Sequence, residues 1–175
     1  MEPFERIVEA NQRYVAEGSH RSLPVRPSRA LAIVTCMDSR IDAFTSLGLE
    51  LGDAHVLRTA GARVTGDVLR SLALSTHALG TRRVAVIGHT NCGLHDPDGT
   101  LVDRLSSLLG RTPFQPEWGA FSDPRNAVRE DCARLRQWPD RPAELGVAGY
   151  VLDVEDGLLH EVVAPAMVPA PDPMD

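Results

Sequence analysis

Lysine is absent from the 175 residues, and arginine supplies all 18 basic side chains. Without lysine, the chain cannot form a Schiff base on an ε-amino group, build a P-loop, or bind ATP phosphates as a kinase does. Asp and Glu together number 24, so the formal net charge is −6. An acidic chain is a poor ligand for nucleic acid or for anionic membranes. We therefore expect neither partner.

Long apolar runs and a secretory signal are also missing. No apolar run approaches the roughly 18 residues that a membrane span needs. Residues 1–6 lack the basic-then-apolar order of a signal peptide, so we expect a cytoplasmic protein. Cysteine occurs only three times, and this odd number disfavours a disulfide framework. A metal site or a reactive thiol is the favoured use of these thiols.

The apolar pattern predicts an α/β fold. A continuous apolar run over residues 30–35 is typical of a strand buried on both faces of a parallel sheet. Further strands are expected over residues 54–58 and 83–88. Helices are expected over residues 66–79, 101–109 and 124–138. In the first of these, Thr65 is the expected N-cap and Leu74 belongs to the apolar, mostly buried set. The result is a mainly parallel central sheet flanked by helices.

The two ends of the chain complete this prediction. An amphipathic helix over residues 5–18 would form an N-terminal arm. Residues 147–154 and 158–163 flank an Asp-Gly turn, which predicts an antiparallel C-terminal edge strand. We therefore expect one domain over residues 1–163. The tail over residues 164–175 contains four prolines and is predicted to be disordered.

Three metal-ligating side chains follow the two buried strands. Cys36 comes at the end of the first, and His89 and Cys92 follow the other. Ligands bind at the carboxyl ends of parallel strands, so these side chains should converge if the strands are neighbours. Two thiolates and an imidazole suit Zn²⁺, and three protein ligands leave a fourth position for water, as in catalytic sites. A buried thiol or histidine alone is commonly structural, and we interpret Cys132 that way.

Asp38 and Arg40 form a second candidate pair. Asp38 lies two residues after Cys36 and could reach the same metal as a fourth ligand. Arg40 can hold a carboxylate through two parallel hydrogen bonds. The pair therefore predicts a gate: the metal keeps its water while Arg40 holds Asp38, and a released Asp38 displaces that water. The alternative is a surface ion pair worth less than about 1 kcal/mol.

Two motifs and one shorter segment resemble those of the β-class carbonic anhydrases, above all their small prokaryotic subclass: Cys36-x-Asp38-x-Arg40, His89-x-x-Cys92-Gly93 and Arg58-Thr59-Ala60-Gly61. The resemblance implies Zn²⁺ held by Cys36, His89 and Cys92, with Asp38 and Arg40 as the catalytic dyad. It implies hydration of CO₂ to bicarbonate and a proton by zinc-bound hydroxide. It also implies a homodimer or higher homo-oligomer, in which the N-terminal helix embraces the neighbouring subunit.

Two other functions are compatible with the same zinc motif. Relatives that carry it hydrolyse carbonyl sulfide or carbon disulfide, and a non-catalytic zinc-binding or thiol-sensing module could retain the scaffold. Asp38 and Arg40 argue against the non-catalytic alternative, because a structural zinc site needs no gate. Thr59 departs from the asparagine that is usual in the family.

Overall fold

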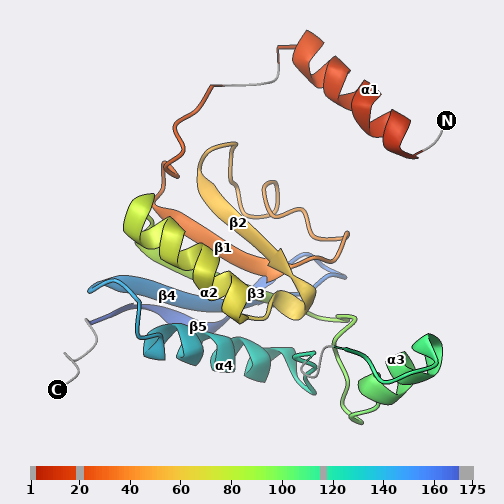
Figure 1. Ribbon diagram of the computed structural model, residues 1–175. Helices are drawn as coiled ribbons and strands as arrows, with labels where there is room; N and C mark the ends of the chain where they lie inside the picture. The colour runs from red at the N-terminus through yellow and green to blue at the C-terminus, as the bar shows by residue number, and fades with distance from the viewer. Residues whose placement is uncertain (1–2, 19–21, 115–117, 170–175) are drawn as a thin grey trace.

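A five-stranded sheet with the strand order β2-β1-β3-β4-β5 forms the centre of the protein (Figure 1). The computed structural model describes residues 3–18, 22–114 and 118–169. The strands are β1 (Leu31–Cys36), β2 (Ala54–Thr59), β3 (Arg83–His89), β4 (Leu145–Leu152) and β5 (Leu159–Val168). Pairing is parallel from β2 through β4, and β5 runs antiparallel to β4. The predicted fold class, including the antiparallel edge strand, is confirmed.

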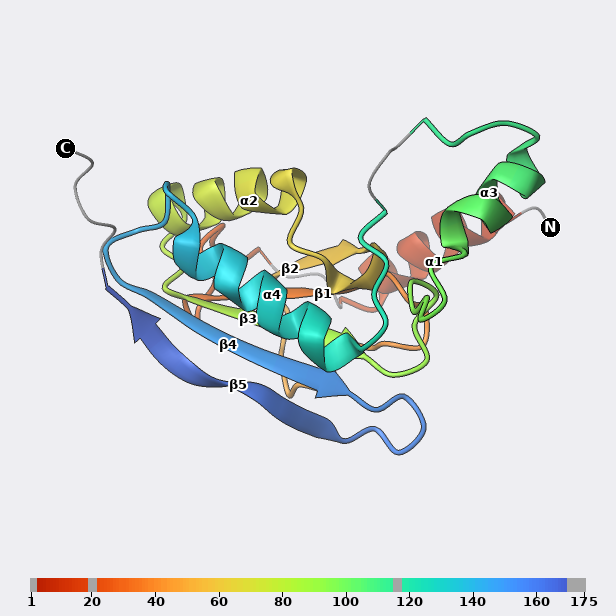
Figure 2. The same cartoon turned by 90° about the horizontal axis from the view of Figure 1, so that it is seen from below.

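The helices also follow the prediction closely. They are α1 (Pro3–Ala16), α2 (Gly66–Ala73), α3 (Leu101–Leu109) and α4 (Pro124–Gln137), with short helical turns η1 (Ala60–Ala62) and η2 (Leu74–Ala78). Both α2 and α4 cover the same face of the sheet (Figures 1 and 2). Valines that point to this face from β1, β3 and β4 pack against Leu72 of α2 and Leu135 of α4. Burial on both faces explains why β1, and β3 between Arg83 and His89, consist of almost uninterrupted apolar residues.

The end of the second helix differs from our expectation. Thr65 caps α2 as predicted, because its side chain accepts a hydrogen bond from the Val68 N–H. After Ala73, however, the chain continues as the π-helical turn η2. A π turn contains more residues per turn than an α-helix, so the buried face shifts along the sequence. Leu74 is consequently 60% exposed, while Ser75 and Thr76 are buried. The expected burial of Leu74 was wrong.

The C-terminal strand is longer than the sequence pattern indicated. Since β5 continues to Val168, the expected disorder is wrong for residues 164–168. Pro165 has no N–H to donate to a strand ladder, and it lies where the β4–β5 register shifts, between Val163 and Ala166. A bulge in an edge strand accommodates this proline without a lost ladder bond. Residues 170–175 of the expected tail lie outside the described residues.

The N-terminal arm is helical, as predicted, and stands apart from the sheet (Figure 1). Its apolar residues remain open to solvent in the single chain, and Phe4 and Ile7 are 80% and 64% exposed. Among the described residues, no helix combines the length and apolar character needed to cross a membrane.

Gly149 of β4 packs tightly against α4, and an alanine there should destabilise the protein. A Cβ at this position would lie 2.6 Å from Cγ1 of Val128 and 2.8 Å from Sγ of Cys132. Overpacking of this kind typically costs about 1–3 kcal/mol. We expect Gly149→Ala to lower the free energy of unfolding by that amount in urea denaturation. The matched control is Gly66→Ala, because a Cβ there would meet nothing within 4 Å. An equal effect of both substitutions would contradict the packing argument.

Candidate metal centre

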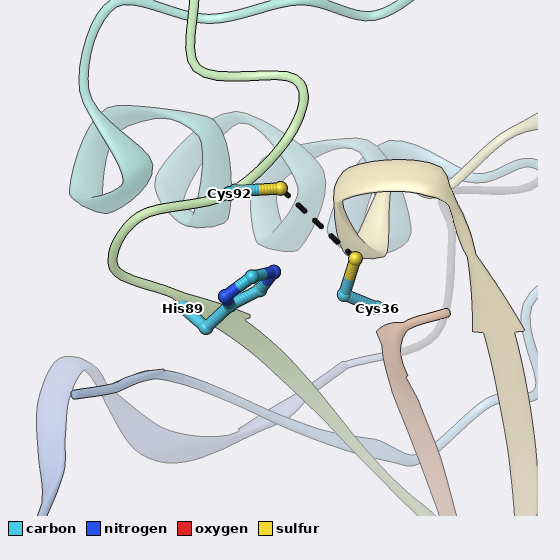
Figure 3. Close-up of side chains that lie close together, drawn as sticks. All are labelled: Cys36, His89 and Cys92. Carbon is cyan, nitrogen blue, oxygen red and sulfur yellow. Dashed lines mark hydrogen bonds between the residues drawn. The ribbon is translucent and has the colours of Figure 1, made fainter. Parts of the chain in front are cut away.

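Three potential metal ligands meet at the carboxyl ends of β1 and β3 (Figure 3). The two strands are parallel neighbours, with Thr35 opposite Ile87, so their ends lie side by side. Cys36 is the last residue of β1, His89 is the last of β3, and Cys92 lies in the loop that follows. Their ligand atoms all lie within 4.8 Å of one another, and all three residues are buried. The structure thus brings together the three residues singled out in the sequence.

His89 presents a free lone pair to this cluster. Its Nδ1 lies 2.8 Å from the carbonyl oxygen of Thr90. A carbonyl can only accept, so Nδ1 carries the proton and Nε2 is the unprotonated nitrogen. In the part of the chain that the structure describes, this buried Nε2 has no hydrogen-bond partner. A buried polar atom without a partner is costly, and a metal ion between the imidazole and the thiols would satisfy it.

The two thiols interact strongly with each other. Their sulfur atoms lie 4.0 Å apart (Figure 3). A hydrogen bond from the Cys92 thiol stabilises the Cys36 thiolate and lowers the pKa of Cys36 to about 4. The same contact raises the pKa of Cys92 above its usual range, because Cys92 is the proton donor and a second thiolate beside Cys36 would be repelled. The backbone N–H groups of Asp38 and Gly61 also lower the pKa of Cys36. A divalent cation would remove the repulsion between two thiolates. One nitrogen and two sulfur donors therefore fit Zn²⁺.

Asp38 borders the cluster and is held by Arg40. Nε of Arg40 donates to Oδ1 at 2.9 Å and Nη2 donates to Oδ2 at 2.7 Å, so the pair is bidentate. The backbone N–H of Arg40 also donates to Oδ1. These contacts hold the pKa of the Asp38 carboxyl well below its usual range. The carboxylate also lies near the imidazole, with Oδ2 3.9 Å from Nε2 of His89.

Two further arginine contacts tie the loops of the site together. Nη2 of Arg40 also donates to the carbonyl oxygen of Asn91 at 2.8 Å, which joins the loop after β1 to the loop after β3. Arg58, at the end of β2, donates from Nε to the Cys36 carbonyl and from Nη2 to the Asp38 carbonyl. Sequence reasoning assigned no role to Arg58. The available signal was the segment Arg58-Thr59-Ala60-Gly61, which resembles the family and begins at the end of the strand expected over residues 54–58.

The third cysteine lies elsewhere, as expected for a structural residue. Cys132 is buried in the core between α4 and the sheet. Its thiol contacts the carbonyl oxygen of Ala148 at 3.5 Å, and burial raises its pKa to about 11. A neutral, enclosed thiol is chemically inert.

Comparisons with known proteins agree with this geometry. A family model described as carbonic anhydrase matches residues 31–97, which include β1, β3 and all three candidate ligands. The chain is 39% identical over 155 residues to "Beta-carbonic anhydrase 1" of Mycobacterium tuberculosis, covering 87% of this chain and 94% of that protein. It is 47% identical over 157 residues to a carbon disulfide hydrolase of Saccharolobus solfataricus, covering 76% and 77%.

Structural similarity extends over nearly the whole chain. A crystal structure of carbonic anhydrase from Streptococcus mutans superposes with a TM-score of 0.86 at 40% sequence identity, covering 93% of this chain and 98% of that one. Because sequence and fold agree over this length, the protein belongs to the β-carbonic anhydrase family.

Proposed function

We propose that this protein catalyses the reversible hydration of CO₂ to bicarbonate and a proton, with Zn²⁺ held by Cys36, His89 and Cys92. The observation that carries the proposal is the ionised Asp38 carboxylate, fixed by Arg40 beside a buried set of one nitrogen and two sulfur donors. A structural metal site has no use for such a carboxylate. The cytoplasmic location expected from the sequence stays a prediction.

Asp38 and Arg40 have different roles in the proposed reaction. A bound zinc ion supplies a Lewis acid that makes water nucleophilic near neutral pH. The Asp38 carboxylate, ionised at that pH, accepts a hydrogen bond from the attacking water and orients its lone pair toward CO₂. Arg40 keeps both carboxylate oxygens engaged, so that Asp38 orients the nucleophile and leaves the ion open to it. The proton released in the reaction passes to solvent.

The direct test is stopped-flow CO₂ hydration with protein of measured zinc content, across about pH 7 to 9. Two thiolates offset the charge of the ion, so we expect rates that rise with pH over this range. One zinc ion per chain with such a profile would support the proposal. One zinc ion per chain without CO₂ hydration at any pH would contradict the proposal. Carbon disulfide and carbonyl sulfide are the next substrates to try, since a carbon disulfide hydrolase is among the relatives.

We also propose that the protein associates with a second copy of itself through α1. The helix carries five exposed apolar side chains: Phe4, Ile7, Val8, Tyr14 and Val15. The face of the sheet opposite α2 and α4 has an apolar groove of about 450 Å³, lined in part by Ile33, Ile87 and Met167. An exposed apolar helix and an open apolar groove in one chain are complementary surfaces for two copies.

Polar substitutions on the apolar face of α1 should weaken this association. We expect the double variant Ile7→Ser/Val8→Ser to shift the protein toward monomer in sedimentation velocity, because burying each aliphatic side chain contributes about 1.5–3 kcal/mol. The matched control is Asn11→Ser, a polar residue of the same helix. A wild-type protein that is monomeric at all concentrations, or a double variant that associates as the wild type does, would contradict the proposal.

A further inference from the structure

We propose that the turn between β4 and β5 orients the metal-binding imidazole, with Thr90 and Asp153 as positioning residues. The inference rests on the proposed zinc site and extends it to a segment more than 60 residues away in the sequence. Neither residue touches the cluster of thiols and imidazole through its side chain. Both act through the backbone that follows His89.

Thr90 is held in place by the end of β4 and the turn after it. Its N–H donates to the Leu152 carbonyl at 3.0 Å. Its hydroxyl donates to Oδ1 of Asp153 at 3.2 Å and accepts from the Val154 N–H at 3.1 Å. Three hydrogen bonds from three consecutive residues therefore fix both the backbone and the side chain of Thr90.

The fixed residue provides the acceptor that sets the histidine. The Thr90 carbonyl accepts the Nδ1 proton of His89 at 2.8 Å, which fixes the tautomer and restricts rotation of the ring. The ring is thereby held with Nε2, which has no hydrogen-bond partner among the described residues, close to the two sulfur atoms. The next residue, Asn91, adopts a positive φ of 53°, and its carbonyl oxygen accepts a hydrogen bond from Arg40. The short loop between the imidazole and Cys92 is thus anchored at two successive residues.

The turn is itself closed around Asp153. The same Oδ1 that accepts from Thr90 accepts from the Glu155 N–H at 2.9 Å. The Asp153 carbonyl accepts from the Gly157 N–H, and the Asp153 N–H donates to the Leu158 carbonyl, both at 2.9 Å. Asp153 therefore closes the turn through its own hydrogen bonds and also accepts the hydrogen bond from the Thr90 hydroxyl. The hairpin, which contributes no ligand, becomes part of the metal centre.

The rate of zinc release to a chromophoric chelator tests this directly, without any substrate. We expect Thr90→Val, which keeps the β-branched shape and removes the hydroxyl, to release zinc about 10-fold faster, the lower end of outer-shell effects. Asp153→Ala should do the same. Thr90→Ser, which keeps the hydroxyl, should stay within about twofold of the wild type. If Thr90 and Asp153 act as one unit, the double variant should be no faster than either single variant.

A residue of the same turn provides the matched control. Asp156 accepts the Leu158 N–H at 2.8 Å but has no hydrogen bond to Thr90. We expect Asp156→Ala to release zinc at the wild-type rate. If it releases zinc as fast as Asp153→Ala, turn integrity alone matters and the inference is wrong. Wild-type release from Thr90→Val would also overturn it.

A second readout reports the ligand geometry. The visible absorption bands of the Co²⁺-substituted protein should shift in Thr90→Val and stay unchanged in Asp156→Ala. Unshifted bands in Thr90→Val would contradict the inference. A wild type that binds zinc but does not hydrate CO₂ would contradict the proposed function and leave this inference standing. A wild type that binds neither Zn²⁺ nor Co²⁺ would contradict both the proposed function and this inference.

Discussion

Arg40→Ala should keep one zinc ion per chain and lose about 99% of CO₂ hydration, a roughly 100-fold fall that is typical of a misplaced catalytic group. The substitution removes both side-chain hydrogen bonds that hold the Asp38 carboxylate, and also the hydrogen bond from Nη2 to the Asn91 carbonyl. Oδ2 of Asp38 already lies 3.9 Å from Nε2 of His89, the nitrogen that we propose binds the ion. A released carboxylate can therefore swing toward the ion and take the position that water needs. Metal analysis and stopped-flow hydration on the same sample measure the two effects separately.

The matched control for this variant is Arg70→Ala. Arg70 also pairs with an aspartate on its own chain segment, with Nε 3.1 Å from Oδ1 of Asp67, but both side chains are exposed on α2. Exposed pairs contribute well under about 1 kcal/mol, so zinc content and turnover should match the wild type. Normal turnover in Arg40→Ala would show that Asp38 needs no partner. Loss of zinc from that variant would show that Arg40 supports the metal site itself.

Cys92→Ser should abolish both zinc binding and activity. A serine hydroxyl stays protonated near neutral pH and cannot replace a thiolate ligand. The remaining imidazole and single thiolate cannot complete the site. We expect zinc affinity to fall by more than about 100-fold, beyond what the loss of an outer-shell partner costs. Hydration should fall to the uncatalysed rate. Metal analysis after dialysis against a chelator measures the occupancy.

Cys132→Ala is the matched control, since it removes a thiol that is equally buried but lies in the core. This variant should keep full zinc occupancy, although the loss of the sulfur atom leaves a small cavity beside Gly149. Full zinc in Cys92→Ser would refute the assignment of Cys92 as a ligand. Zinc loss in both variants would show only that the fold has been damaged.

Much of the architecture could be predicted because its signal is local. The apolar runs of β1 and β3 reflect burial on both faces, which affects every residue of these strands after the first. The errors came where tertiary contacts override local preference. The π turn exposes Leu74, and the bulge at Pro165 lets β5 continue through a residue that ordinarily ends a strand. Neither feature has a periodic signature in the sequence.

The candidate site shows the same contrast between local sequence signals and tertiary contacts. Residue chemistry and position at the strand ends were enough to select Cys36, His89 and Cys92, because donor atoms and spacing are properties of the chain itself. The state of Asp38 and the free lone pair of His89 became visible only in the fold, since each depends on which hydrogen-bond partners lie nearby. The role of the β4–β5 turn likewise depends on contacts between residues distant in sequence. Sequence spacing identifies candidate ligands, whereas the partners that orient them are brought close only by folding.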